Sequence, residues 1–176
     1  MKKPLKIALY VLLALVLIVL AYVIYVFAAY YRVEDMQTLD VVQFSVQDHV
    51  TGGESALPME GAPQTGVTYR VSSANIGFGA YSDDYSFFMD GGKESRARSR
   101  QAVGENMRGE VSLVKDLSPD FALFQEVDID GTRSWHIAED AYLDDAMGGN
   151  EFDEVFAQNY DSPYLFYPFI NPHGAN

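Results

Sequence analysis

Cysteine is absent from this chain of 176 residues. Its absence excludes thiol catalysis, disulfide bonds and metal sites built on cysteine sulfur. Only three histidines are present, and His136 and His173 lack the helical spacing of a zinc site. The sequence also contains no Gly-x-Ser-x-Gly motif, no P-loop and no dinucleotide-binding glycine pattern. These absences exclude several common kinds of active site.

Basic residues are also few, with 12 Lys and Arg against 25 Asp and Glu. Every acidic residue follows position 31, where only nine basic residues accompany them, so this part of the chain carries a net charge of −16. Nucleic acids are attracted by Lys and Arg, and this charge therefore disfavours DNA or RNA as a partner.

Charge is missing altogether from residues 7–31, which are overwhelmingly apolar. Such a segment spans about 37 Å as a helix, enough to cross a hydrocarbon core of about 30 Å. Because the apolar core of a signal peptide is shorter, we expect an uncleaved signal anchor, with cleavage at Val26-Phe27-Ala28 as the alternative. The lipid bilayer is therefore an expected partner.

The charges that flank this segment predict its orientation. Lys2, Lys3 and Lys6 lie within residues 1–6, whereas Arg32 on the other side is followed by acidic residues. The positive-inside rule then places the basic N-terminus in the cytoplasm. Residues 32–176 are expected outside the cell membrane, anchored by a single pass.

After the anchor, the sequence alternates between strand-like and helix-like segments, which predicts an α/β fold. Residues 32–66 read as a tether (32–38), a first strand (39–46) and a loop rich in glycine and proline (51–66). Further strands are expected at 67–76, 121–127 and 152–157, helices at 95–117 and 136–147, a long surface loop at 80–94, and a loop and edge segment at 160–169.

Two of these segments carry a specific pattern. Apolar side chains at helical spacing predict one buried stripe within residues 95–117: Val103, Met107, Val111 and Val114. Residues 121–127 are mostly apolar without interruption, which is typical of a strand covered on both faces. The order strand, helix, strand predicts a crossover between parallel strands.

Asn75 and Glu126 each end one of the two expected parallel strands. Ligands gather at the carboxyl ends of strands in such sheets. Carboxylate and carboxamide oxygens suit hard cations such as Mg²⁺ or Mn²⁺, and Mg²⁺ commonly takes only one or two protein ligands beside substrate phosphate. The residues therefore predict part of a metal site, with an ordinary ion-paired glutamate as the alternative for Glu126.

Three weaker candidates lie further along the chain. Arg133 follows Glu126 and could contact a substrate phosphate, although a surface salt bridge is the favoured reading. His173 lies in a Pro-His-Gly loop that could border the site. The spacing from Asp128 to Glu139 matches a calcium-binding loop, but the preceding strand favours an ordinary polar turn.

Two segments resemble a known protein family. Residues 73–77 read Ser-Ala-Asn-Ile-Gly, and after the expected helix residues 119–128 read Pro-Asp-Phe-Ala-Leu-Phe-Gln-Glu-Val-Asp. Both resemble the start of the endonuclease/exonuclease/phosphatase family, the DNase-I-like superfamily, over residues 67–176. The later stretch from residue 156 to Gly174 is similar to a membrane-anchored bacterial branch of that family.

The resemblance implies a four-layered α/β sandwich, of which this chain supplies the N-terminal half. It implies that Asn75 orients the scissile phosphate or water, and that Glu126 ligates Mg²⁺ or Mn²⁺. The family's Gly-Asp-x-Asn motif, which holds its general base, and its terminal Asp-His pair are absent.

We therefore expect the N-terminal part of a membrane-anchored, extracytoplasmic phosphoesterase that acts on a phosphodiester or phosphomonoester and is inactive by itself. Nucleic acid, as for an endonuclease, is the alternative substrate. A noncatalytic membrane-anchored binding domain or a degenerate remnant is the alternative function.

Overall fold

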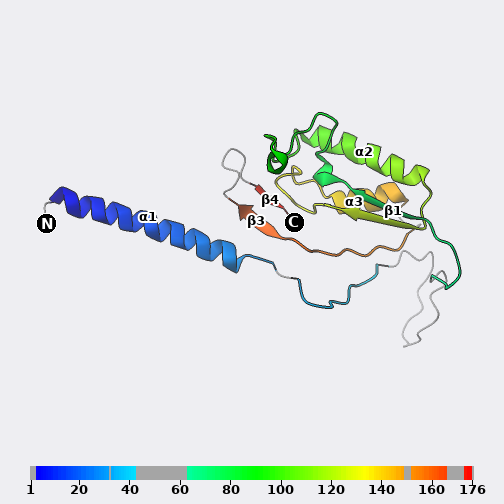
Figure 1. Ribbon diagram of the computed structural model, residues 1–176, viewed down its shortest axis with the longest axis horizontal. Coiled ribbons are helices and arrows are strands. Elements are labelled where there is room, and N and C mark those ends of the chain that lie inside the picture. Colours follow the sequence, from blue (N-terminus) through cyan, green and yellow to red (C-terminus); the bar gives the residue numbers. More distant parts are fainter. Residues whose placement is uncertain (1–2, 32, 43–62, 149–151, 166–172, 176) are drawn as a thin grey trace.

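The computed structural model describes the chain except for residues 1–2, 32, 43–62, 149–151, 166–172 and 176, and it describes side chains as far as residue 162. The described part is a mixed α/β structure preceded by one apolar helix (Figure 1). Its elements, in chain order, are α1 (Lys3–Ala28), β1 (Val71–Asn75), η1 (Gly77–Gly79), η2 (Phe88–Asp90), α2 (Arg100–Asp116), β2 (Phe121–Gln125), α3 (Glu139–Met147), β3 (Ser162–Leu165) and β4 (His173–Ala175).

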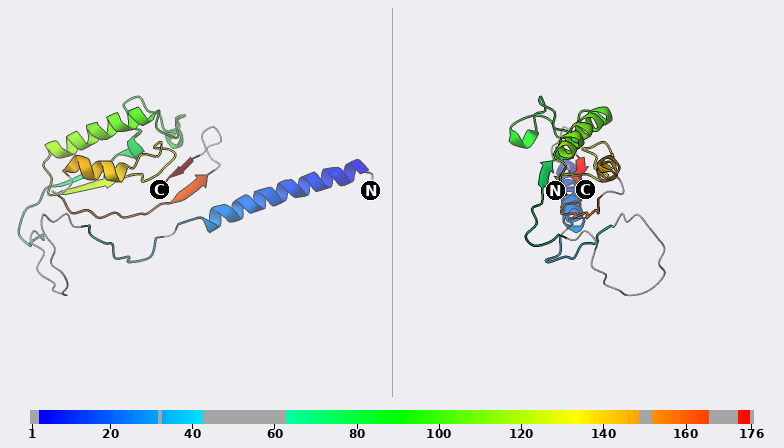
Figure 2. Two further views of the ribbon diagram at one scale, coloured as in Figure 1. Left: turned by 180° about the vertical axis from the view of Figure 1, so that it is seen from behind. Right: turned by 90° about the vertical axis from the view of Figure 1, so that its right-hand side faces the viewer.

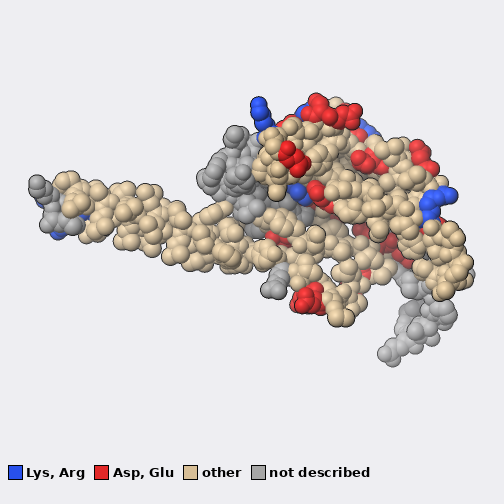
Figure 3. All heavy atoms as spheres, in the orientation of Figure 1, with Lys and Arg blue, Asp and Glu red and all other residues tan. Residues whose placement is uncertain are grey.

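Helix α1 extends away from the rest of the chain and buries none of its residues (Figures 1 and 3). It is long and apolar enough to cross a membrane, and a signal sequence near an N-terminus has the same properties. The helix begins at Lys3 and ends at Ala28, so it includes part of the expected basic segment and stops before Tyr30 and Tyr31.

Strands β1 and β2 are parallel neighbours, connected through helix α2. Val71 lies beside Phe121 and Asn75 beside Gln125, so the two strands end together. This arrangement confirms the expected strand, helix, strand crossover. A second pair, β3 and β4, is antiparallel.

Among the residues that the structure describes, only one face of the β1–β2 sheet is covered by helices. Figure 2 shows α2 and α3 on the same side of the strands. Ala122 and Phe124 pack toward the core that the buried stripe of α2 forms, and that stripe consists of the four residues expected from the sequence. On the opposite face, Leu123 is 52% exposed. The expected coverage of β2 on both faces is therefore wrong for the described residues, because the core helices lie on one side.

Other boundaries differ from expectation for local reasons. Helix α2 begins at Arg100 because the hydroxyl of Ser99 accepts a hydrogen bond from the amide of Ala102, an N-cap that ends the irregular segment before it. Helix α3 begins at Glu139, after the turns of residues 131–137. The strand expected at 152–157 is reduced to an isolated bridge between Val42 and Glu154.

Two expected segments fall partly outside the described residues. Residues 39–46 were expected to form a strand, and of these only 39–42 are described, with the bridge at Val42 as their one strand-like contact. Most of the expected glycine- and proline-rich loop at 51–66 also lies outside the described residues, as does part of the segment at 160–169.

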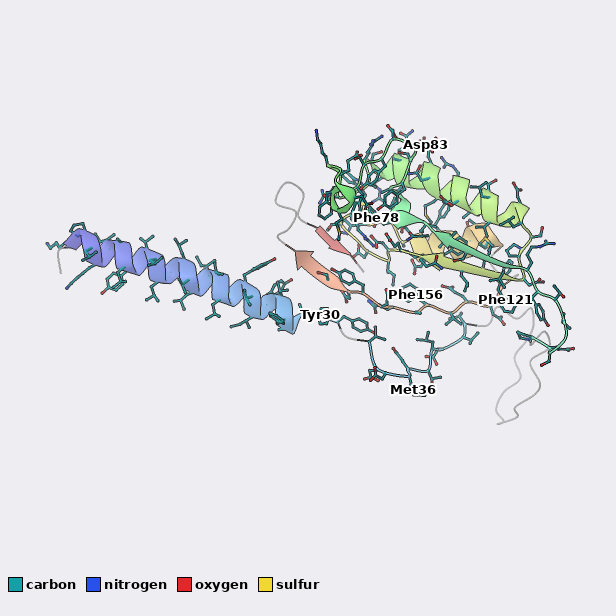
Figure 4. All side chains as sticks on the ribbon, in the orientation of Figure 1. Tyr30, Met36, Phe78, Asp83, Phe121 and Phe156 are labelled. Carbon is teal, nitrogen blue, oxygen red and sulfur yellow. The ribbon has the colours of Figure 1, made fainter. Side chains whose placement is uncertain are left out.

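Residues 80–94 form a loop, but the expectation that it lies on the surface is wrong in part. Tyr85 and Phe87 pack against the hydrophobic core and make ring contacts with Phe78, which is fully buried. Figure 4 places Phe78 near the carboxyl end of β1 and Phe121 at the other end of the sheet. The aromatic residues of the loop therefore pack into the core at the end of the sheet where Asn75 lies.

Candidate functional site

The structure brings Asn75 and Glu126 together at the carboxyl end of the parallel strands. The side-chain amide of Asn75 donates a hydrogen bond from Nδ2 to Oε1 of Glu126, at 3.0 Å. Its Oδ1 accepts from the backbone amide of Gly77, at 2.9 Å. Asn75 is thus fixed at both ends of its carboxamide, and it holds one oxygen of the Glu126 carboxylate in place. Both side chains are exposed.

Backbone hydrogen bonds continue past the ends of the two strands and fix their turns. The amide of Ile76 donates to the carbonyl of Gln125 at 3.0 Å, and that of Phe78 donates to the carbonyl of Glu126 at 2.9 Å. Phe78 (φ 45°) and Glu126 (φ 56°) both adopt left-handed backbone conformations. Such conformations are uncommon for residues other than glycine, and they concentrate at functional sites.

The second carboxylate oxygen of Glu126 is available to a ligand. Within the described residues, Oε2 makes no hydrogen bond or ion pair, and Asn75 provides the one hydrogen bond to this side chain. An exposed carboxylate with an oriented free oxygen fits a hard divalent cation that keeps most of its waters. Among the described residues there is no group of three or more His, Asp or Glu arranged around a metal. A metal here would therefore rely on one protein carboxylate.

Arg133 forms an ion pair with the buried carboxylate of Asp128. Its Nη2 lies 2.8 Å from Oδ1 of Asp128 and its Nε lies 3.0 Å from Oδ2, a two-pronged ion pair. The Asp128 side chain is 1% exposed and that of Arg133 is 18% exposed. The guanidinium also stacks over the ring of Phe78, 4.2 Å from its centroid. Arg133 therefore joins the loop that contains Asp128 to the segment that contains Phe78. A contact of Arg133 with phosphate remains a prediction.

Glu139, at the start of α3, completes this buried cluster. Its Oε2 accepts a hydrogen bond from the amide of Asp128 at 2.9 Å, and its own amide donates to the carbonyl of Asp128. Its Oε1 lies against Gly79 and has no hydrogen-bond partner among the described residues. Burial is the main reason that the pKa of Glu139 rises to about 8.

The buried cluster of Asp128, Arg133 and Glu139 is connected to the candidate site through the two loops that carry Glu126 and Asn75. Asp128 lies two residues after Glu126. Gly79 lies on η1, whose first residue fixes Asn75. In the sequence, Asp128 and Glu139 stand out only by their calcium-like spacing; in the structure, Glu139 accepts a hydrogen bond from the amide of Asp128, and the Asp128 carboxylate pairs with Arg133.

Tyr81 lies beside the residues that form the site. Its ring lies against Gly77, where an added methyl group would overlap it, and it contacts the rings of Phe78, Tyr85 and Phe87 at centroid distances of 5.8, 5.0 and 5.9 Å. Burial, followed by the carboxylates of Glu126 and Asp90, raises the pKa of Tyr81. The sequence signal for this residue was the aromatic stretch that directly follows the Asn75 motif.

His173 was expected in a loop, but it belongs to strand β4, and its side chain lies outside the described residues. Other histidine and arginine side chains of the α/β part have partners of their own. His136 places Nδ1 2.7 Å from Asp130, and both side chains are more than half exposed. Arg98 is paired with Asp84 and Glu94, and the guanidinium of Arg100 donates to the carbonyl of Trp135.

Comparisons of the chain with models of protein families, with curated proteins and with solved structures found no match.

Proposed function

We propose that this chain carries the metal-binding part of a membrane-anchored, extracytoplasmic, divalent-metal-dependent phosphoesterase. The observation that supports it most is the hydrogen bond from Asn75 to Glu126 at the carboxyl end of parallel strands, where the second oxygen of Glu126 has no partner among the described residues. The family resemblance of the two segments that contain these residues, 73–77 and 119–128, supports the same function.

In this proposal, Glu126 would hold Mg²⁺ or Mn²⁺, which supplies stabilisation of the charge that develops on the phosphoryl oxygens. Asn75 has a second Nδ2 hydrogen, beyond the one donated to Glu126, and that hydrogen can orient a phosphate oxygen. The general base belongs to the Gly-Asp-x-Asn motif of the family, which this sequence lacks, so catalysis requires a polypeptide that also carries that motif.

The charge of the protein favours a small phosphodiester, phosphomonoester or lipid headgroup over a long nucleic acid. Acidic side chains spread over the visible face of the α/β part, whereas few basic ones interrupt them (Figure 3). The net charge of −16 beyond residue 31 repels a polyanion. A small substrate carries fewer negative charges than a nucleic acid, so it is repelled less. Its phosphate would lie beside the cation, which offsets the remaining repulsion.

The open face of the β1–β2 sheet is consistent with both candidate functions, because each supplies something to cover it. Val71, Phe121 and Leu123 are exposed apolar side chains on this face. In a four-layered sandwich, a second sheet would cover them. In the alternative, a noncatalytic anchored binding domain, a partner would cover them, and the exposed face is the observation that favours that second candidate.

The activity is tested by hydrolysis of a chromogenic phosphodiester, measured with the longest natural polypeptide that contains this chain. Hydrolysis is expected to require Mg²⁺, to stop with EDTA and to resume with Mn²⁺. Glu126→Gln should lower kcat by about 100-fold, because the cation contributes several kcal/mol to the transition state. The matched variant Glu105→Gln, on the exposed side of α2, should be unchanged. Equal rates for the wild type and Glu126→Gln contradict the proposal.

The proposed orientation in the membrane is tested with cysteine labels, since the natural chain has no cysteine. A membrane-impermeant maleimide applied to intact cells should label Met36→Cys, which lies just beyond α1 and is 99% exposed. It should label Lys3→Cys, at the other end of α1, only after the cells are lysed. The reverse pattern contradicts an extracytoplasmic domain.

A further inference from the structure

We propose that Tyr81 is the phosphate-positioning residue of this site, donating a hydrogen bond from its hydroxyl to an oxygen of the bound phosphate group. This inference rests on the proposed function, because it places the phosphate beside the Glu126 carboxylate. It adds a residue that lies outside both segments carrying the family resemblance.

The first support is the position of the ring. Tyr81 lies against Gly77, the residue whose amide fixes the carboxamide of Asn75. Gly77 has no side chain and a φ of 52°, so the ring can approach the backbone closely at this point. Tyr81 is thus held next to the pair that forms the candidate site.

The second support is that the ring is held in place while its hydroxyl is unused. Three neighbouring rings surround it in edge-on or tilted contact: Phe78, Tyr85 and Phe87. Nevertheless, Tyr81 is 41% exposed, and within the described residues its hydroxyl makes no hydrogen bond. A fixed, unpaired donor loses little conformational freedom when a ligand accepts its hydrogen bond.

The third support is electrostatic. The Tyr81 hydroxyl is a donor at neutral pH, because the ordinary pKa of tyrosine is 10.0 and burial, followed by the charges of Glu126 and Asp90, raises it further. Without a cation, Glu126 repels a phosphate near Tyr81. A cation held by Glu126 would offset that repulsion, and the protonated hydroxyl could then donate its hydrogen bond to an oxygen of the phosphate.

Tyr85 provides a matched control in the same aromatic cluster. Its hydroxyl donates to the backbone carbonyl of Arg96 at 3.1 Å, so its hydrogen bond is used inside the protein. Tyr81→Phe and Tyr85→Phe remove the same atom from neighbouring rings that contact each other. Only the first removes a group available to a ligand.

The test measures Mn²⁺ and inorganic phosphate binding to the full chain in lipid nanodiscs. Mn²⁺ is followed by electron paramagnetic resonance, and phosphate by the ³¹P relaxation that bound Mn²⁺ causes. We expect Tyr81→Phe to weaken phosphate binding about 10-fold, the effect of one hydrogen bond to a charged group, with Mn²⁺ affinity unchanged. Tyr85→Phe should bind both ligands as the wild type does.

The outcomes separate this inference from the proposed function. Unchanged phosphate affinity in Tyr81→Phe, with Mn²⁺ binding lost in Glu126→Gln, overturns the role of Tyr81 alone. Mn²⁺ and phosphate binding that survive Glu126→Gln overturn both, whereas a wild-type chain that binds Mn²⁺ but no phosphate overturns the role of Tyr81 alone. If Tyr81→Phe unfolds, the ¹³Cζ resonance of Tyr81 in the wild type decides: a shift on adding phosphate with Mg²⁺ supports the proposal, and no shift overturns it.

Discussion

Arg133→Met is expected to lower the free energy of unfolding by about 3 to 5 kcal/mol, the usual cost of removing one partner from a buried ion pair. The variant keeps a long apolar side chain but leaves the Asp128 carboxylate, 1% exposed, without its two-pronged partner. It also removes the cation from the face of Phe78. Urea unfolding can be followed through the fluorescence of Trp135, the single tryptophan.

Arg98 supplies the control for this prediction. It makes ion pairs of 2.6 and 2.7 Å with Asp84 and Glu94, as short as those of Arg133, but its side chain is 42% exposed. Exposed pairs are worth at most about 1 kcal/mol, so Arg98→Met should cost little. Adding Asp128→Asn to Arg133→Met should recover part of the lost stability. Equal losses for Arg133→Met and Arg98→Met contradict the structural role of the buried cluster.

Glu139→Gln is expected to remove a large pH dependence of stability. The pKa of Glu139 is about 8 in the folded chain, against an ordinary value of 4.5. Below pH 4.5 the Glu139 carboxyl is protonated in both the folded and the unfolded state, so its titration does not change the free energy of unfolding there. As the pH rises toward 8, the unfolded chain releases this proton more readily, so the folded state loses stability. The loss is on the order of 4 kcal/mol, at about 1.4 kcal/mol per pKa unit.

The variant is compared with the wild type by urea unfolding between pH 4.5 and 8.5. Glutamine can still accept the hydrogen bond from the amide of Asp128 but does not ionise. The stability of Glu139→Gln relative to the wild type should therefore increase with pH across this window. The groups that face Glu139 are Asp128, Asp140 and Arg133, and they remain unchanged in the variant. Parallel pH profiles for the two proteins contradict a buried, protonated Glu139.

The helical core could be predicted because its signal is local. The stripe of α2 depends on side chains three and four residues apart, and all four of its members are buried, from Val103 to Val114. The parallel crossover followed from the order of the elements. In contrast, the segment at 152–157 looks like a strand in sequence, yet strand formation requires a neighbour, and the described residues provide one only at Val42.

The covered and open faces of the sheet could not be read from β2. Alternate residues of the run 121–127 face opposite sides, and both sides are apolar in sequence, so the pattern alone implies two covering layers. The described chain supplies helices on one side only. Likewise, the aromatic loop resembles a surface loop because its glycines and acidic residues suggest exposure, although Tyr85 and Phe87 pack into the core.

The pair of residues at the site could be predicted from the sequence, but the residues that pack around the pair could not. Asn75 and Glu126 could be singled out because each polar residue ends an apolar strand, and parallel strands end at the same edge. The roles of Tyr81 and Glu139 depend on contacts across the fold, with Gly77 and Gly79 respectively, that have no fixed spacing in sequence. Such contacts appear only when the two loops are placed against each other.

In the proposed function, Glu126 holds a divalent cation and Asn75 orients its carboxylate, so Mn²⁺ binding to the full chain in nanodiscs is the decisive measurement. Electron paramagnetic resonance should show a site from which Mg²⁺ displaces Mn²⁺. Glu126→Gln should abolish this site, and Asn75→Ala should weaken it about 10-fold, because Asn75 orients the ligating carboxylate. The same Mn²⁺ affinity in the wild type, Glu126→Gln and the control Glu105→Gln would contradict a cation site at Glu126.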